Sequence, residues 1–286
     1  MIFHLVKWYV KRFQFPRRGL KYFVRLLKLT GDLNKTYVKK LHNDYLLRVN
    51  PKDHIQRQIF WYGYYEKKYI LTWTNFVRPD DIVFDIGANI GYYSIIASSK
   101  ARQGRIYAIE PYQEHYNALL DNIRLNNIDN IEALNLAVSD REQELQLFIA
   151  SEENTGMTGL TKSTNFSGYI EKVNAISLDE WIKAGKLLKP NLIKMDIEGA
   201  EWMSLQGMQM MLRETKPVMF IEIASSLLTR FGSQSSNIYQ FMNELGYKAY
   251  QVIQHNKLKL VKDFTDDELI VFIPEAYKIP TNVEIV

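Results

Sequence analysis

The chain has 286 residues, of which 47% are hydrophobic and 13% aromatic, and a formal net charge of +4. This length and composition support a folded domain with a substantial core and exclude global disorder. The absence of cysteine excludes disulfides, thiolate metal sites and a cysteine nucleophile.

Positive charge concentrates at the N-terminus. Residues 1–48 carry twelve lysines and arginines and two aspartates, a net charge of +10, so residues 49–286 carry −6. We interpret residues 1–50 as a basic amphipathic helical extension, with two short helices broken near Pro16 and Gly19. Their apolar faces either cover the domain or lie on an anionic membrane through residues 1–48.

Charges interrupt every apolar stretch of this extension, so no stretch reaches the roughly 18–20 apolar residues of a membrane-spanning helix. No uninterrupted hydrophobic region precedes a small-residue cleavage site, so no signal peptide is expected. The predicted localisation is cytoplasmic, with peripheral association at the membrane surface as the further option.

Residues 51–286 are predicted to form one α/β domain, with a helical lead-in over 51–79 and a core over 80–275. Short β-branched runs alternate with helical segments, which is typical of a mostly parallel sheet. Strands are expected at Ile82–Ile86, Arg105–Ile109, Ile131–Val138, Leu192–Ile197, Val218–Ile223 and, more weakly, Tyr247–Ile253 and Leu269–Ile273. Helices are expected through Ser94–Ser99, after Pro111, and over Leu178–Ala184, Ala200–Leu212 and Ser236–Leu245, with a long functional loop at Ser151–Ser167.

The strongest local motif is an apolar strand that runs into a glycine turn and then a helix, from Asp85 to Ser94. Gly87 permits a tight turn, and Gly91 lets the start of the helix approach a ligand closely. Free backbone N–H groups there suit an anionic group. Asp85 can accept hydrogen bonds from an ammonium.

A second acidic residue, Glu110, ends the next strand nineteen residues after Gly91. Its two carboxylate oxygens match the two vicinal hydroxyls of a ribose. The two glycines are four apart and lack the middle glycine of G-x-G-x-x-G, and Asp85 would repel a diphosphate. The spacing therefore favours S-adenosylmethionine over a dinucleotide.

Two further strand ends carry candidate residues. Val138 could pack on an adenine ring while Asp140 or the Ser139 backbone meets its amino group, although Ser-Asp is also an ordinary turn. Asp196 and Glu198 alternate along the fourth strand end and share a face. Glu201 lies one turn into the next helix, where it is expected to cap that helix.

These motifs, together with Ser177-Leu178-Asp179 and the Lys194-Met195-Asp196-Ile197-Glu198-Gly199-Ala200-Glu201 segment, resemble the FkbM family of methyltransferases over roughly residues 58–225. The resemblance implies a class I methyltransferase Rossmann-like fold: a seven-stranded, mostly parallel sheet with a reversed last strand and helices on both faces. It also implies O-methylation of a sugar, glycolipid or polyketide-type hydroxyl. Tyr65-Glu66 resembles a further family element.

The site prediction combines the residue arguments with this resemblance. The predicted cofactor-binding residues are Glu66, Asp85, Gly87, Ala88, Asn89, Gly91, Tyr92, Ser94, Glu110, Pro111, Val138, Asp140 and Asp196, and the predicted catalytic residues are Asp196, Glu198 and Glu222.

Two schemes for activating the acceptor hydroxyl stay open. A general base would remove its proton, with Asp196, Glu198, Glu222, His54 and His115 as candidates. A divalent cation bridging Asp196 and Glu222 would act as a Lewis acid instead, although no motif supports it.

Two other functions also stay open at this point. The basic arm could serve a nucleic-acid methyltransferase, but the acidic body and the missing Asn/Asp-Pro-Pro-aromatic tetrad argue against nucleic acid as a partner. Alternatively, the fold could be a non-catalytic, membrane-associated module. A small molecule or glycan is the expected acceptor, and the oligomeric state is left open.

Overall fold

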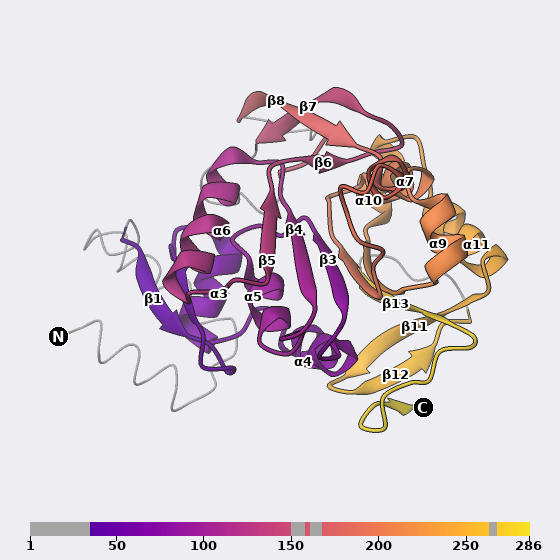
Figure 1. Cartoon of the computed structure of the whole chain (residues 1–286), viewed down its shortest axis with the longest axis horizontal. Coiled ribbons are helices and arrows are strands. Elements are labelled where there is room, and N and C mark those ends of the chain that lie inside the picture. The colour runs from indigo at the N-terminus through magenta and orange to yellow at the C-terminus, as the bar shows by residue number, and fades with distance from the viewer. Residues whose placement is uncertain (1–34, 150–157, 161–167, 263–267) are drawn as a thin grey trace.

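The computed structural model describes residues 35–149, 158–160, 168–262 and 268–286 (Figure 1). The predicted amphipathic helices around Pro16 and Gly19 lie outside these residues, as does most of the predicted loop Ser151–Ser167. No helix among the described residues is long and apolar enough to cross a membrane.

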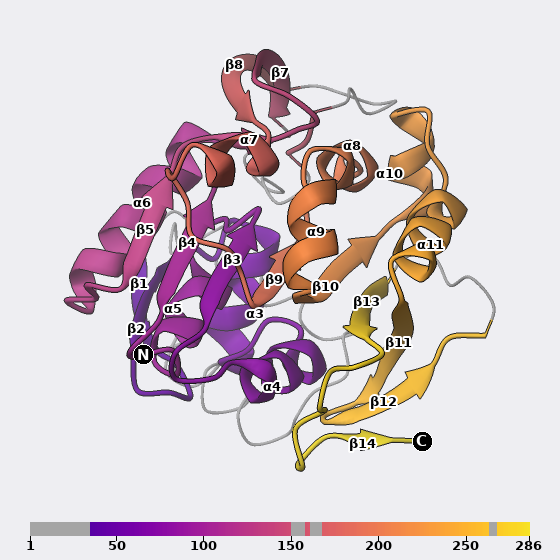
Figure 2. The same ribbon diagram turned by 45° about the vertical axis from the view of Figure 1, so that its right-hand side comes forward.

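A twisted sheet forms the centre of the molecule (Figure 2). In the described part of the chain it has nine strands, in the order β14-β12-β11-β13-β10-β9-β3-β4-β5. Their bounds are β3 (Ile82–Ile86), β4 (Arg105–Ile109), β5 (Ile131–Leu134), β9 (Leu192–Met195), β10 (Val218–Ile223), β11 (Tyr247–Gln254), β12 (Lys257–Leu260), β13 (Glu268–Pro274) and β14 (Glu284–Ile285). β13 runs antiparallel between β10 and β11, as the reversed last strand was predicted to do. The predicted number of seven strands was too low, because β12 and β14 extend the edge beyond β11.

Helices cover both faces of this sheet. The first face carries α3 (His54–Tyr62), α4 (Lys67–Phe76), α5 (Tyr92–Ser98) and α6 (Gln113–Leu125). The second carries α7 (Leu178–Lys183), α8 (Glu201–Gln206), α9 (Gln209–Thr215), α10 (Ser225–Arg230) and α11 (Ser235–Glu244). Successive strand residues alternate between the faces, so Val83 joins the first core and Phe84 the second. α3 and α4 both lie within residues 51–79, the predicted helical lead-in.

The end of the predicted helical extension is a β-hairpin instead, formed by β1 (Tyr37–Lys40) and β2 (Leu46–Val49). Leu47 and Val49 are fully buried in the first core, while Arg48 between them is exposed. This alternation with period two is that of a strand packed on one face. The hairpin therefore belongs to the domain, and the boundary at residue 50 was placed too late.

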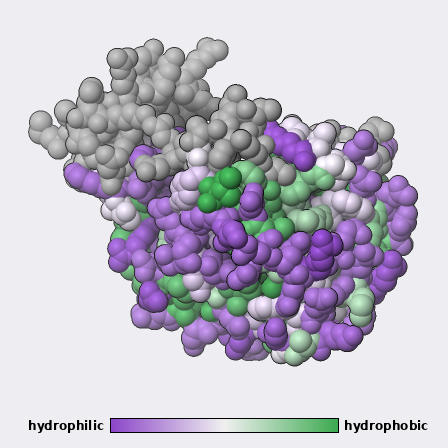
Figure 3. All heavy atoms as spheres, turned by 90° about the horizontal axis from the view of Figure 1, so that it is seen from above, coloured by the Kyte–Doolittle hydropathy of each residue, from purple (hydrophilic) through white to green (hydrophobic). Residues whose placement is uncertain are grey.

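Two more predicted elements are divided in the structure. The run Ile131–Val138 splits into β5 and β6 (Ala137–Val138), and β6 joins a separate sheet with β7 (Gln143–Ile149) and β8 (Tyr169–Ile176). The predicted helix Ala200–Leu212 breaks at Gly207 into α8 and α9, where the Gly207 carbonyl accepts the Asp179 N–H and the Ser177 hydroxyl, both at 2.9 Å. Seen from the side of β7 and β8, the described surface is mostly hydrophilic, with a few hydrophobic residues gathered near its centre (Figure 3).

Candidate active site

A cleft of about 1050 Å³, its open mouth included, lies at the carboxyl ends of β3, β4, β9 and β10. This is the edge at which open α/β sheets bind ligands. Its wall continues onto the second sheet through Leu147 of β7 and onto the short segment Thr158–Leu160.

The glycine turn after β3 forms one side of the cleft. Gly87 has φ +78°, and a Cβ there would lie 1.9 Å from the Asp196 carbonyl oxygen, so no other residue fits. Gly91 has φ +89°, and its Cβ position faces Leu119 of α6 rather than the cleft. The turn is thus pressed against the end of β9 on one side and against α6 on the other.

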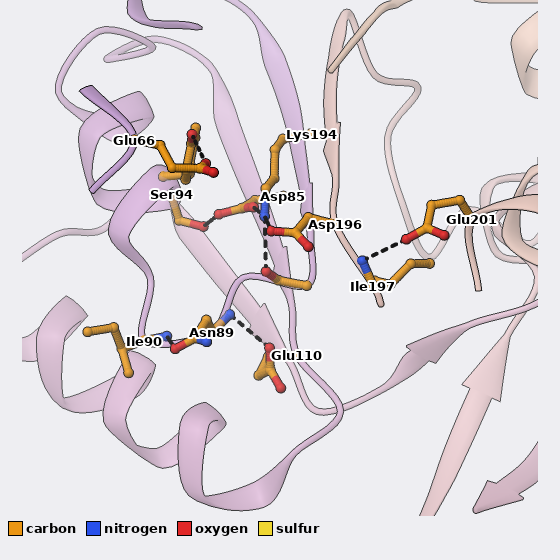
Figure 4. Close-up of polar contacts among 12 residues, drawn as sticks. Glu66, Asp85, Asn89, Ile90, Ser94, Glu110, Lys194, Asp196, Ile197 and Glu201 are labelled. Atoms are coloured by element: carbon orange, nitrogen blue, oxygen red, sulfur yellow. Dashed lines mark hydrogen bonds and ion pairs between the residues drawn. The ribbon is translucent and has the colours of Figure 1, made fainter. Parts of the chain in front are cut away.

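Glu110 holds the turn from β4 (Figure 4). Its Oε2 accepts the backbone N–H of Asn89 at 2.8 Å, and its Oε1 accepts that of Tyr112 at 2.9 Å. Burial raises the pKa of Glu110 to about 7 despite these two hydrogen bonds. Each oxygen retains a lone pair for a ligand, because a carboxylate has about four acceptor positions.

Asp85 lies beneath the turn and is fully buried. Its Oδ2 accepts the hydroxyl of Ser94 on α5 at 2.5 Å, whereas Oδ1 accepts no hydrogen bond and lies 3.9 Å from Lys194 Nζ. Burial raises the pKa of Asp85, although Lys194 and Ser94 oppose that rise. Asp85 and Ser94 support the turn from behind, since neither lines the cleft.

The carboxyl ends of β9 and β10 bring together a cluster of ionisable groups. Asp196 and Glu222 lie on the sheet face of α4 and α5, because their neighbours Met195 and Ile221 point to the opposite core. Lys194 Nζ lies 3.1 Å from Asp196 Oδ2. Burial alone would raise the pKa of Asp196, but Lys194 and a hydrogen bond from Glu222 hold it below the usual value.

Glu222 carries the proton of this carboxyl pair. The charge of Asp196, followed by burial, raises the pKa of Glu222 to about 11. Glu198, at φ +54°, has a pKa raised to about 8 by burial and by Asp196. Near neutral pH, Asp196 is therefore the ionised member beside two largely protonated neighbours.

Tyr65 and Glu66 approach this cluster from the start of α4. Tyr65 lines the cleft, and burial together with Glu66, Asp196, Glu222 and Glu198 raises its pKa above the usual value. Burial raises the pKa of Glu66 to about 7, and Tyr93 donates a hydrogen bond to it at 3.4 Å. Glu66 thus lies with the carboxyl cluster of β9 and β10.

Not every predicted site residue reaches the cleft. The predicted residues that line it are Gly87, Ala88, Asn89, Tyr92, Glu110, Pro111, Val138, Asp196, Glu198 and Glu222. Glu66, Asp85, Gly91, Ser94 and Asp140 are not among the lining residues. Asp140 instead accepts local hydrogen bonds from Ser139 and Gln143, both at 3.0 Å.

Glu201 and Asp179 accept backbone N–H groups beside two helices. Glu201 Oε1 accepts those of Ile197 and Gly199, in the turn before α8 (Glu201–Gln206). Asp179 accepts those of Met210 and Met211 at the start of α9. Glu201 therefore fixes the turn that carries Glu198.

Lys194 and Leu147 line the cleft but were not among the predicted site residues. A lysine inside an otherwise apolar strand already signals a buried ion pair. Leu147 was missed with its strand, despite the alternation of Leu145, Leu147 and Ile149 that is typical of β-structure. His115 lines the cleft, and burial lowers its pKa to about 4.

A divalent cation between Asp196 and Glu222 does not fit these residues. Among the described side chains, no group of three or more His, Asp or Glu is arranged to hold a metal. The ammonium of Lys194, 3.1 Å from Asp196 Oδ2, already supplies a positive charge beside Asp196.

The fold and the cleft define the class of protein. A mostly parallel sheet with the reversed strand β13 between β10 and β11, a glycine turn after β3 and an acidic residue at the end of β4 together constitute the class I methyltransferase fold. Residues 85–249 match the family described as the methyltransferase FkbM domain, which is more than half of the chain. The protein therefore belongs to this family.

Relatives of known name match over part of their length. The hexuronic acid methyltransferase AglP of Haloferax volcanii is 29% identical over 131 residues, covering 46% of this chain and 51% of the relative. Methyltransferase 1 of Beauveria bassiana is 23% identical over 148 residues, covering 46% of this chain and 59% of the relative. The matches thus span about half of each of these proteins. The crystal structure of an FkbM methyltransferase from Methylobacillus flagellatus superposes with a TM-score of 0.44 at 17% identity, covering 68% of this chain and 44% of that one.

Proposed function

We propose that this protein transfers a methyl group from S-adenosylmethionine to a hydroxyl of a sugar, a glycolipid or a related natural product. The observation that carries the proposal is one cleft whose two sides carry different chemical groups. One side has the glycine turn and Glu110, and the other has the Asp196–Glu222 carboxyl pair.

The residues of the first side fit an adenosyl amino acid. Glu110 offers its remaining lone pairs to a ribose diol, and Val138 offers an apolar surface at the end of β6. Ala88, Asn89, Tyr92 and Pro111 complete this side of the cleft. Bound there, S-adenosylmethionine supplies an electrophilic methyl group.

The residues of the second side fit the removal of a proton from an acceptor. A hydroxyl that gains a methyl group becomes strongly acidic, so even a carboxylate of low pKa can accept its proton. Asp196 is the ionised carboxylate on this side of the cleft, while Glu222 and Glu198 are largely protonated near neutral pH. We assign Asp196 as the general base, with Glu222 as the partner that shares its proton.

The sugar class of acceptor draws its support from the similarity to the hexuronic acid methyltransferase over 131 residues. Neither the nucleic-acid function nor the non-catalytic module gains support from the family. Contact with anionic membranes through residues 1–48 stays a prediction. Co-sedimentation with anionic vesicles of the full chain, compared with a chain that begins at Lys35, would test it.

Transfer of labelled methyl from S-adenosylmethionine to a panel of hexosides, hexuronides and glycolipids would test the proposed function. We expect label in an ether-linked methyl group of at least one sugar, and a loss of about 100-fold or more in kcat for Asp196→Asn. Label in nucleic acid or protein, with none in any sugar, would overturn the proposal.

A further inference from the structure

Lys194 is a buried cation at the junction of the two sides of the cleft. It lies on β9 directly opposite Asp85 of β3 and beside Phe220 of β10. Its side chain is 6% exposed. Burying an ammonium costs free energy unless it is paired, so the partners of Lys194 indicate its role.

The contacts of the Lys194 ammonium reach both sides. Nζ donates to Asp196 Oδ2 at 3.1 Å and to the Gly87 carbonyl oxygen at 3.3 Å, and it lies 3.9 Å from Asp85 Oδ1. It also lies 5.2 Å from the centre of the Tyr93 ring. One side chain therefore joins the glycine turn to the proposed base.

The surroundings of Lys194 are otherwise acidic. The ionisable groups that interact with it or with Asp196 come from every neighbouring element: Asp85 from β3, Tyr93 from α5, Tyr65 and Glu66 from the start of α4, Glu110 from the end of β4, Glu198 and Glu201 after β9, and Glu222 from β10. Among the described residues that line the cleft, Lys194 is the only lysine or arginine. No other permanent positive charge in this described lining could replace it.

We propose that Lys194 is a positioning residue, which keeps Asp196 as the carboxylate of the cluster and fixes it against the glycine turn. The proposal rests on the proposed function, because it explains how the base is kept ionised beside the cofactor side. Without the ammonium, burial and the surrounding carboxyl groups would favour protonation of Asp196. An acceptor hydroxyl would then meet no base.

The direct test is the ionisation of Asp196 itself, measured by ¹³C NMR on protein labelled at the aspartate carboxyl carbons, with Asp196→Asn to identify the signal. In the unchanged protein we expect an ionised Asp196 from pH 5 to pH 8. In Lys194→Met, which has similar length and no charge, we expect the midpoint to rise into this pH range. An ionised Asp196 throughout this range in Lys194→Met would overturn the proposal.

A matched control and a milder variant keep this test interpretable. Lys189→Met removes an exposed lysine that pairs with Glu214, and it should leave the Asp196 signal unchanged. Lys194→Met leaves Asp85 buried without a cation, which could prevent folding. In that event the midpoint is measured in Lys194→Met with Asp85→Asn, where the same upward shift supports the proposal and its absence contradicts it.

Chemical rescue separates a charge effect from a packing effect. In Lys194→Ala, the space left by the side chain can admit methylammonium, which restores both the charge and the N–H donors. We expect methylammonium to return the Asp196 signal towards its ionised position, and tetramethylammonium, which is larger and has no N–H, to have no effect. Equal effects of the two cations would contradict the proposal. None of these measurements needs an acceptor, so a failure to methylate sugars would leave them unaffected.

Discussion

At the scale of single residues, the shape of the cleft depends on a few close contacts between strand ends. Gly87 combines a left-handed backbone with a backbone oxygen of Asp196 at 1.9 Å from its Cβ position. Glu110 accepts hydrogen bonds from two backbone N–H groups, and Asp196 accepts one from the buried ammonium of Lys194. Each of these residues therefore links one strand end to another.

We predict that Gly87→Ala abolishes binding of S-adenosylhomocysteine and lowers stability, because the added methyl group must displace the Asp196 backbone. Gly63→Ala is the matched control: Gly63 has the same φ of +78° and nothing within 4 Å of its Cβ position. It should cost only about 1–2 kcal/mol of backbone strain and leave binding intact. Calorimetry and chemical unfolding of both variants measure the difference, and equal behaviour of the two would refute the packing argument.

Because Asp196 and Glu222 share a proton, we expect their substitutions to have different effects on kcat. Asp196→Asn removes the base, so kcat should fall about 100-fold or more. Glu222→Gln keeps a donor towards Asp196, so its kcat should fall much less. Steady-state kinetics on the methylated acceptor decide this. A greater loss in Glu222→Gln would identify Glu222 as the base instead.

At the scale of elements, apolar runs that end at a chemical motif were predicted well. β3, β4 and β10 lie where β-branched residues precede Gly87, Glu110 and Ala224, since a strand buried on both faces reads as a continuous apolar run. The elements that were missed or misplaced depend on distant partners. At the helix break the Gly207 carbonyl is hydrogen-bonded to Ser177 and Asp179, and Ile131–Val138 is divided by the pairing of β6 with β8.

In the candidate site, too, features that depend on distant partners could not be predicted from the sequence. Glu110 and the glycine turn were predicted because their spacing along the chain is diagnostic. The proton shared by Asp196 and Glu222 depends instead on two strands adjoining in the sheet, and on the buried Lys194 beside them. Spacing in the sequence carries no information on such charge balance.

The hairpin yields a prediction at this scale. Asn126 donates to and accepts from the Leu46 backbone, and Asn122 accepts from Arg48 while donating to the Ile90 carbonyl in the glycine turn. A chain that begins at Asn50 loses these contacts and the buried Leu47 and Val49.

Burial of each such side chain contributes about 1.5–3 kcal/mol. Chemical unfolding should therefore show a loss of several kcal/mol relative to a chain that begins at Lys35. Equal stability of the two chains would show that the hairpin is dispensable.

At the scale of the whole molecule, the buried carboxyl groups make stability depend on pH. Burial raises the pKa of Glu66, Glu110 and Glu201 to about 7 and that of Glu198 to about 8, from a usual value of 4.5. Between these values the folded protein binds more protons than the unfolded chain. The stability from these groups is therefore complete below pH 4.5 and is lost as pH rises through 7–8.

We predict that the Tm of the ligand-free protein falls between pH 6.5 and pH 8.5. His115 has the opposite effect, because its pKa is lowered to about 4, but that contribution is complete above pH 6.5. Glu201→Gln removes one of these buried carboxyl groups and should make the decline shallower. A Tm that rises over this interval in thermal scans would contradict the assigned protonation states.

We propose that the turn from Asp85 to Gly91, together with Glu110, binds an adenosyl amino acid. Titration calorimetry with S-adenosylhomocysteine tests it most directly, with NAD as the competing ligand and Glu110→Gln as the variant. We predict binding of S-adenosylhomocysteine, no binding of NAD, and an affinity at least about tenfold lower in Glu110→Gln, which is about 1.4 kcal/mol. Absence of binding to the unchanged protein, or equal binding of NAD, would show that this turn is not a site for an adenosyl amino acid.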